Sequence, residues 1–357
     1  MRVYNFSAGP SMLPLEVLEE AQRELLDFAG TGMSVTEISH RDKAYSAVVE
    51  EAERNLRELL NVPESYCVIF VQGGASQQFA AVPLNLMHKG KADYLVTGNF
   101  AKKAWQEGKI YGNARVAASS EEKVYTYIPD VDKVQFDDEA DYVHFTSNNT
   151  IFGTRFTKFP ETVAPLVCDM SSDILSREID VSKFGVIYAG AQKNLAPAGV
   201  TIVIARKDLI ENPRPECPTM LKWKTQAENG SLYNTPPCFS IYIANLVLRH
   251  LKKLGGVKEI NKINEYKAGL LYDFIDNSPY YTNSVVKKDR SIMNVPFVTP
   301  SKEADEKFVK EAKAAGLVSL KGHRLVGGMR ASIYNAMPVE GVKALIEFMK
   351  KFESENV

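Results

Sequence analysis

Hydrophobic residues follow two alternating patterns along this chain, short apolar runs and longer stretches with helical spacing. Residues 43–60 (KAYSAVVEEAERNLRELL) place apolar side chains at helical spacing among charged ones, which predicts an amphipathic helix. Short apolar runs predict strands at 67–71, 94–96, 143–146, 166–168, 185–189 and 200–205. Strands and helices that alternate over about 200 residues predict an α/β layered fold.

One connection between predicted strands can be decided by its length. Residues 190–199 join the strands at 185–189 and 200–205. A parallel crossover needs about a dozen residues or more, so these two strands are predicted to be antiparallel neighbours in a mostly parallel sheet. Lys193 then lies at the carboxyl end of a strand, which is the edge where open α/β sheets bind their ligands.

After residue 277 the order of elements changes, which predicts a second, smaller α/β unit. The elements expected from 239 onward are helices at 239–254 and 257–277, a strand at 292–298, a helix at 301–315, strands at 317–320 and 329–334, and a helix at 339–352. We expect a large domain of residues 16–260 and a small domain formed by residues 1–15 and 261–357.

The charge balance limits the classes of partner. Lys plus Arg number 43 and Asp plus Glu number 44, so the net charge is −1 and no general basic surface for nucleic acid is expected. No apolar stretch is long enough to cross a bilayer. The start, MRVYNFSAGPSMLP, lacks the pattern of a secretory signal. We expect a cytoplasmic protein with no nucleic-acid or membrane partner.

Cysteines and histidines give little support to a disulfide framework or a metal site. None of the four cysteines forms a CxxC pair, so we expect free thiols in a reducing compartment at Cys67, Cys168, Cys217 and Cys238. The five histidines show no HExxH or similar spacing. No metal is therefore predicted.

Three features follow predicted strands: Gly73-Gly74-Ala75-Ser76, Asp169 and Lys193. Taken singly, they have ordinary explanations as a tight turn, a helix N-cap and a solvated loop lysine. Together on one edge of a sheet they match what pyridoxal phosphate requires. A lysine amine forms a Schiff base with its aldehyde, a carboxylate keeps the pyridine nitrogen protonated, and a helix N-terminus holds the phosphate.

Lys193 also has unusually small and apolar neighbours, in YAGAQKNLAPAG (188–199). Partial desolvation lowers the pKa of a lysine and favours the neutral, nucleophilic amine. Small neighbours leave room for a cofactor to approach. The stretch therefore favours Lys193 as the cofactor lysine.

Motifs spread over the whole chain resemble the phosphoserine aminotransferase family: NFSAGPSMLP (5–14), EISHRDKAY (37–45), QGGASQQFAAVP (72–83), GAQKNLAPAGVT (190–201) and GHRLVGGMRASIYNAMP (322–338). The resemblance implies a pyridoxal-phosphate-dependent transaminase of fold type I, in the class V branch. It implies a mostly parallel seven-stranded sheet with one antiparallel strand in a large domain, plus a smaller α/β domain. It also implies amino transfer from L-glutamate to 3-phosphohydroxypyruvate in serine biosynthesis, with a related phosphohydroxythreonine reaction of pyridoxine synthesis as an open possibility.

By this resemblance, Lys193 and Asp169 are the catalytic residues. The implied cofactor-binding residues are Ala75 and Ser76 in the phosphate turn, Trp105 stacked on the ring, Thr150 near the ring hydroxyl, Gln192 beside the phosphate, and Asn234 and Thr235 from a neighbouring subunit. Some family members have Gly-Arg at the positions of Ala75 and Ser76, so this turn lacks a cationic side chain. The shared residues imply a homodimer.

The implied substrate-binding residues are cationic, since both substrates carry an α-carboxylate and a distal anion. Arginine binds a carboxylate or phosphate through two hydrogen bonds. The resemblance assigns the α-carboxylate to Arg330, and the distal anion to His40, Arg41, His323 and Arg324, some of them from the partner subunit.

Three other functions stay open at this point. A cysteine desulfurase of the same fold branch needs a reactive cysteine near the cofactor, and Cys238 is not excluded. A non-catalytic protein that senses an anionic metabolite is a second alternative. A nucleotide-binding protein is a third, although the GGAS turn lacks the GxGxxG and GxxxxGK[ST] patterns.

Overall fold

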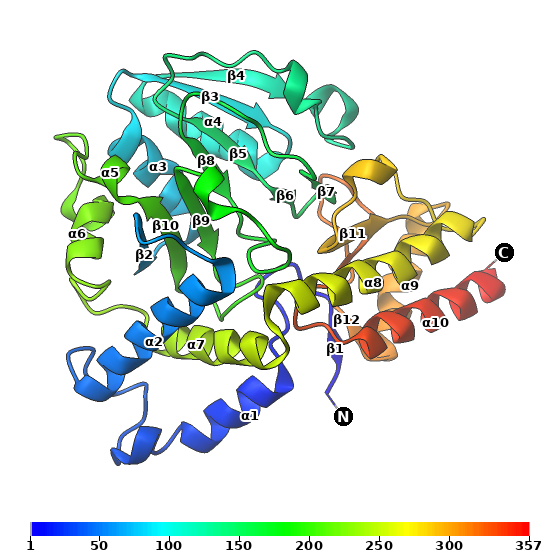
Figure 1. The fold of residues 1–357 in the computed structure, drawn as a ribbon. Helices are drawn as coiled ribbons and strands as arrows, with labels where there is room; N and C mark the ends of the chain where they lie inside the picture. Colours follow the sequence, from blue (N-terminus) through cyan, green and yellow to red (C-terminus); the bar gives the residue numbers. More distant parts are fainter. Residues whose placement is uncertain (1, 357) are drawn as a thin grey trace.

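A seven-stranded sheet forms the centre of the computed structural model, which describes residues 2–356 (Figure 1). Its strands, in order across the sheet, are β2 (Tyr66–Val71), β10 (Thr201–Arg206), β9 (Val186–Gly190), β8 (Leu166–Asp169), β5 (Val143–Thr146), β3 (Lys91–Val96) and β4 (Asn113–Ser119). Strand β10 runs antiparallel to β2 and β9, and the other neighbours are parallel. The predicted fold and the antiparallel strand are confirmed.

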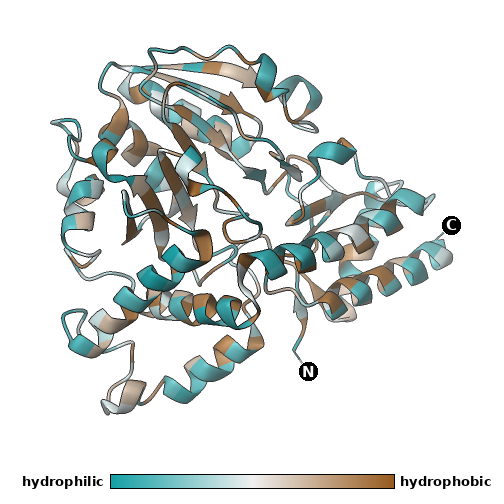
Figure 2. Ribbon diagram, in the orientation of Figure 1, coloured by the Kyte–Doolittle hydropathy of each residue, from teal (hydrophilic) through white to brown (hydrophobic). Residues whose placement is uncertain are grey.

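Alternation along the strands divides the core into two layers. In β10, Ile202 and Ile204 belong to one hydrophobic cluster, while Val203 and Ala205 belong to the other. The first cluster includes residues of α2 (Lys43–Leu60) and α7 (Cys238–Lys253), and the second includes residues of α3 (Gly74–Leu86) and α4 (Asn99–Tyr111). Because successive side chains of a strand point to opposite faces, the sheet is covered by helices on both sides. Figure 2 shows the apolar central strands between helices with hydrophilic outer faces.

A second core forms beside the sheet. It includes residues of α8 (Gly256–Asn277), α9 (Lys302–Ala314) and α10 (Val339–Asn356), and of the antiparallel pair β11 (Asn294–Phe297) and β13 (Met329–Ser332). Strand β1 (Tyr4–Asn5) joins it by pairing in parallel with β12 (Leu317–Val318).

Helix α8 crosses between the two cores (Figure 1). Its residues Val257 and Ile260 belong to the large core, whereas Ala268 and Leu271 belong to the small one. This arrangement supports the proposed division into residues 16–260 and residues 1–15 with 261–357.

Several elements did not follow from the hydrophobic pattern. They are α1 (Leu15–Glu24), α4, β4, the hairpin of β6 (Asn148–Asn149) and β7 (Thr154–Arg155), α5 (Lys207–Ile210), α6 (Trp223–Glu228), and short 3₁₀ turns at Phe28–Gly30, Glu121–Lys123, Val131–Lys133, Val181–Lys183, Thr219–Leu221 and Lys287–Asp289. Strand β4 lies at the sheet edge and is largely half-buried, so it has no continuous apolar run.

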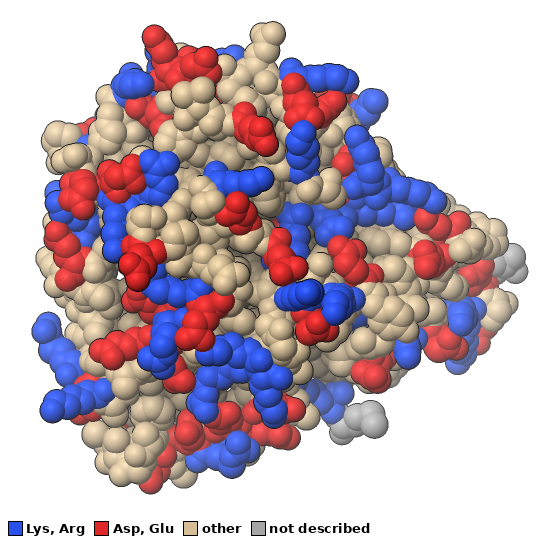
Figure 3. Space-filling model, viewed as in Figure 1, with Lys and Arg blue, Asp and Glu red and all other residues tan. Residues whose placement is uncertain are grey.

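Charged side chains of both signs are mixed over the face in Figure 3, as expected from the net charge of −1. Among residues 2–356 no helix combines the length and the apolar character needed to cross a membrane.

Candidate active site

Lys193 lies in the tight connection between β9 and β10, as predicted. Its Nζ donates a hydrogen bond to Thr150 Oγ1 at 2.7 Å and lies 4.8 Å from the centre of the Phe100 ring. Burial lowers the pKa of the Lys193 amine to about 8, the Asp169 charge opposes this shift, and the Arg330 charge adds to it. About a tenth of this amine is therefore neutral at pH 7, far more than for a solvated lysine, and the neutral form is the one that a nucleophile or a general base requires.

The neighbouring backbone holds Lys193 in place. Within the connection, the N–H groups of Leu195 and Ala196 donate to the Ala191 carbonyl at 3.0 and 2.9 Å. The next residue, Asn194, accepts a hydrogen bond from the Asn335 N–H at 2.9 Å. The loop is thus fixed both by its own turn and by the segment that follows β13.

Asp169 ends β8 and is only 3% exposed. Its Oδ1 accepts a hydrogen bond from the Ser171 N–H at 2.9 Å. Burial raises the pKa of this carboxyl, and the positive charge of Lys193 opposes the rise. A buried carboxylate of this kind is stabilised by a proton-bearing group that faces it.

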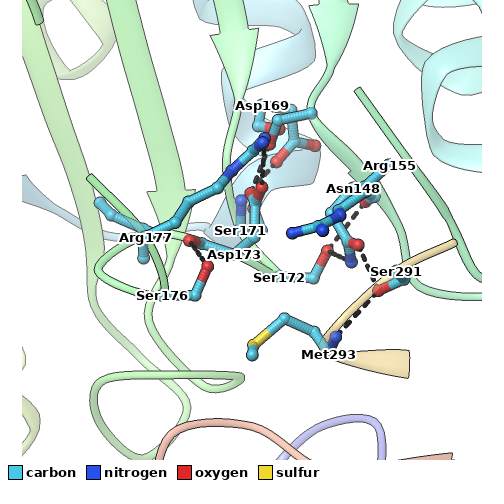
Figure 4. A network of polar contacts seen from close by, with 12 residues as sticks. Asn148, Arg155, Asp169, Ser171, Ser172, Asp173, Ser176, Arg177, Ser291 and Met293 are labelled. Carbon is cyan, nitrogen blue, oxygen red and sulfur yellow. Dashed lines mark hydrogen bonds and ion pairs between the residues drawn. The ribbon is translucent and has the colours of Figure 1, made fainter. Parts of the chain in front are cut away.

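A polar network supports the Asp169 loop from below (Figure 4). Ser147 donates to the carboxylate of Asp173 and to the Asp169 carbonyl, the latter at 3.2 Å. Asp173 also pairs with Arg177 at 3.3 Å. These buried groups satisfy one another, so they hold the loop rigidly.

The same network reaches β11 through Asn148, whose amide donates to Ser172 Oγ at 2.8 Å and to Asn294 Oδ1 at 2.9 Å. Asn294 in turn donates to Ser332 Oγ at 3.0 Å. Because Ser332 ends β13, the network fixes the position of Arg330 on that strand relative to the Asp169 loop.

Helix α3 begins in a form suited to a phosphate. Gly73 and Gly74 have φ angles of +89° and +66°, and no side chain caps the helix. The predicted residues Ala75 and Ser76 lie in the first turn, where helix N–H groups have no partner within the helix. Gln192 lies next to Lys193, and its carbonyl accepts a hydrogen bond from the Ser11 N–H at 3.0 Å.

Arg330 lies near Lys193, and His323 lies within electrostatic range of Arg330 and Arg324. Arg330 Nη1 donates to the Thr150 carbonyl at 3.2 Å, so Thr150 contacts both Arg330 and Lys193. Burial lowers the pKa of Arg330. His323 has its pKa lowered by burial first, then by the positive charges of Arg330, Arg324 and Lys103.

The other predicted contacts lie on loops that do not touch Lys193 within the described part of one chain. Arg41, Asn234 and Thr235 are exposed, and His40 is half-buried. The Thr235 carbonyl accepts a hydrogen bond from the Gln72 side chain at 3.0 Å.

Trp105, which the resemblance assigned to the cofactor ring, contacts Ala114 and Lys109 in the structure. Its indole N–H donates to the Ala114 carbonyl at 2.9 Å, and its ring lies 4.1 Å from Lys109 Nζ. Five residues along a helix correspond to a rotation of about 140°, so Trp105 and Phe100 cannot face the same side of α4. The aromatic ring beside Lys193 is that of Phe100, which the sequence reasoning missed. The sequence places Phe100 shortly after β3, but it does not show which side chain of α4 faces Lys193.

Comparison with known proteins bears on the identity of the site. Residues 3–345 match the family described as Aminotransferase class-V. The chain belongs to this family. The phosphoserine aminotransferase of Bacillus cereus is 56% identical over 357 residues, which cover 99% of each protein.

Solved structures agree with this assignment. The phosphoserine aminotransferase from Bacillus circulans subsp. alkalophilus is 50% identical with a TM-score of 0.98, over 100% of this chain and 99% of that one. The pyridoxal-phosphate-bound phosphoserine aminotransferase from Trichomonas vaginalis is 41% identical with a TM-score of 0.94, over 98% and 100%. These findings confirm the predicted phosphoserine aminotransferase family and its class of enzyme, a pyridoxal-phosphate-dependent transaminase.

The residues of the site fit this cofactor. Lys193 offers an amine with a lowered pKa, and Asp169 offers a buried carboxylate with a raised one. The uncapped first turn of α3 offers backbone N–H groups for the phosphate. Each requirement is met by a group at the carboxyl edge of the sheet.

Proposed function

We propose that this chain transfers the amino group of L-glutamate to 3-phosphohydroxypyruvate, reversibly, giving O-phospho-L-serine and 2-oxoglutarate. One observation carries the proposal: Thr150 contacts both the Lys193 amine and the guanidinium of Arg330. A proton-transfer group and an anion-binding group therefore lie on either side of one residue. Both are needed to act on the α-carbon of an amino acid.

Lys193 is the proton-transfer residue. When bound, pyridoxal phosphate supplies an aldehyde that holds the amino group and a ring that accepts the electron pair of the Cα–H bond. With the cofactor bound, the neutral Lys193 amine would take the α-proton of the substrate and return it to the former aldehyde carbon, two bonds away, as base and then acid. Its hydrogen bond to Thr150 orients the amine, and Phe100 borders the same space.

Asp169 would hold a proton on the ring nitrogen of bound pyridoxal phosphate. Its buried position disfavours an isolated charge, so a protonated partner lowers its free energy. The Ser171 N–H keeps one carboxylate oxygen in place and leaves the other for that partner. The first turn of α3, with Ala75 and Ser76, and Gln192, which precedes Lys193, would hold the phosphate.

Arg330 binds the α-carboxylate that all four substrates and products share. His323 and Arg324 bind the distal phosphate or carboxylate. A phosphate dianion lying among these cations raises the pKa of His323 toward its ordinary value, which favours the protonated, binding form.

We further propose a cytoplasmic homodimer in which a second copy supplies His40, Arg41, Asn234 and Thr235. Support comes from exposed apolar residues that flank Asn234 and Thr235 in the chain, since Tyr233 is 43% exposed and Phe239 36%. Such residues are usual at subunit interfaces. Mixing inactive Lys193→Ala and Arg41→Ala subunits should restore part of the activity, because one site in each mixed dimer is complete. No restoration under conditions of subunit exchange would contradict shared sites.

Glutamate added to the holoenzyme should abolish the visible cofactor band, and 3-phosphohydroxypyruvate should restore it. If glutamate abolished the band but only a phosphorylated four-carbon keto acid, or another keto acid, restored it, the second substrate would be reassigned. Persulfide formation from cysteine would instead favour a desulfurase. The structure gives that alternative little support, because Cys67, Cys168 and Cys217 are buried and Cys238 is half-buried at the start of α7.

A further inference from the structure

Helix α4 carries a lysine whose charge has no ion-pair partner in the described part of the chain. Lys102 pairs with Glu121, and Lys109 lies over the Trp105 ring at 4.1 Å. Lys103 is exposed and forms no ion pair with any of residues 2–356. Its Nζ lies instead 5.9 Å from the centre of the Phe100 ring.

Phe100 links this lysine to the active site. The same ring lies 4.8 Å from Lys193 Nζ. Residues three positions apart share a helix face, so α4 turns Phe100 and Lys103 toward the same side. Lys102, the next residue back, lies on another face and pairs there with Glu121.

The loop of residues 322–328 approaches α4 from the small domain. Val326 of this loop packs against the same hydrophobic cluster as Phe100. The positive charge of Lys103 contributes, after burial, Arg330 and Arg324, to the lowered pKa of His323. Lys103 therefore lies within electrostatic range of His323, on the face of α4 that carries Phe100.

Like charges gathered in this way repel one another unless an anion lies between them. No carboxylate of the described chain forms an ion pair with His323, Arg324 or Lys103. Lysine is a compact, strongly hydrated charge with three donors, which suits a phosphate dianion. Arg330 contacts Thr150 beside Lys193, whereas Lys103 lies by the Phe100 ring, toward the loop of residues 322–328.

We propose that Lys103 is a further substrate-binding residue, which binds the distal phosphate together with His323 and Arg324 and favours phosphorylated substrates over glutamate. This inference rests on the proposed function. A dianion gains more from an added cation than a carboxylate does, so the contribution is selective. It is also screened by salt, because Lys103 is exposed.

Steady-state kinetics of the Lys103→Met holoenzyme test this role. We expect the KM for 3-phosphohydroxypyruvate to rise about five- to tenfold, with kcat within about twofold and the KM for glutamate within about twofold. Lys102→Met is the matched control and should change neither KM. Lys103→Arg should restore most of the binding.

Inorganic phosphate separates this inference from the proposed function. Phosphate should inhibit the half-reaction of the wild-type holoenzyme with glutamate. The inhibition constant should be about five- to tenfold higher for Lys103→Met. Equal inhibition of both proteins, or an equal rise of both KM values, would overturn the role of Lys103. If the wild-type enzyme bound phosphate but did not convert 3-phosphohydroxypyruvate, the proposed reaction would be refuted. The role of Lys103 would then be decided by the difference in phosphate inhibition between the wild-type protein and Lys103→Met.

Discussion

A Cβ atom added to Gly9 would lie 3.3 Å from Cγ of Lys193. The N-terminal segment thus lies directly against the lysine on which the proposed reaction depends. The segment is held there by its neighbours, since the Ala8 carbonyl accepts a hydrogen bond from the Tyr334 hydroxyl at 2.7 Å and the Ser11 N–H donates to the Gln192 carbonyl at 3.0 Å. Residues far apart in the sequence therefore jointly fix the position of the Lys193 side chain.

Gly9→Ala should lower kcat by about tenfold or more, because the new methyl group presses on the Lys193 side chain and displaces its amine. The backbone at Gly9 also has a φ of +148°, which a residue with a side chain rarely adopts. Gly30→Ala is the control, since Gly30 has a φ of +73° but no atom within 4 Å of the added Cβ. Equal kcat losses in both variants, at equal thermal stability, would argue against a specific effect on Lys193.

The attachment of pyridoxal phosphate to the apoenzyme should depend on pH through Lys193. Only the neutral amine reacts, and its pKa is about 8. The attachment rate should therefore rise about tenfold per pH unit below 8 and level off above it. Stopped-flow absorbance measures the midpoint. A midpoint near 10, the value of a solvated lysine, would contradict the desolvated position of this amine.

Asp169→Asn should move that midpoint to lower pH. The carboxylate charge favours the protonated form of Lys193, so its removal lowers the pKa of the amine further. Turnover should also fall by about 10²- to 10⁴-fold, because an amide does not keep the ring nitrogen protonated. An unchanged midpoint would show that the two side chains do not interact electrostatically.

Phe100 and Trp105 should differ in their effects. Phe100→Leu should weaken cofactor affinity and shift the visible band, since this ring borders the Lys193 amine. Trp105→Phe should leave both unchanged and instead reduce stability by about 1 kcal/mol, through loss of the hydrogen bond to Ala114. The reverse pattern would restore Trp105 as the stacking residue.

Lys267 should matter for stability rather than chemistry. It is fully buried, and its Nζ donates to the carbonyls of Ile333, Tyr334 and Met337 at 3.1, 2.8 and 2.9 Å. Lys267→Met removes this donor from the three carbonyls, although the Tyr334 carbonyl keeps a bond from the Met337 N–H at 3.0 Å, and should lower the free energy of unfolding by about 3 kcal/mol. Urea denaturation measures the change, with the exposed Lys262→Met as control. If the free energy of unfolding fell by less than about 1 kcal/mol, other donors would be satisfying the carbonyls of this segment.

Lys193 and Asp169 could be located from the sequence because each follows an apolar run directly. The position of a residue relative to a strand end needs only the local pattern, and the lengths of the connections determine which strands are neighbours. The antiparallel strand β10 followed from the same reasoning.

Phe100 and the bridging role of Thr150 did not follow from local patterns. The contact between Thr150 and Arg330 joins residues 180 positions apart, across the two cores. Which side of α4 faces the site depends on how that helix packs on the sheet. Such relationships arise only in the assembled tertiary structure. If α4 were rotated about its axis by one residue, a different side chain would face the site.

Reduction of the holoenzyme with borohydride, followed by peptide mass mapping, tests the central claim most directly. The account predicts that the cofactor-derived mass is carried by the peptide containing Lys193, and that Lys193→Ala protein carries none. Labelling of a different lysine, such as Lys103 or Lys267, in the wild-type protein would contradict it.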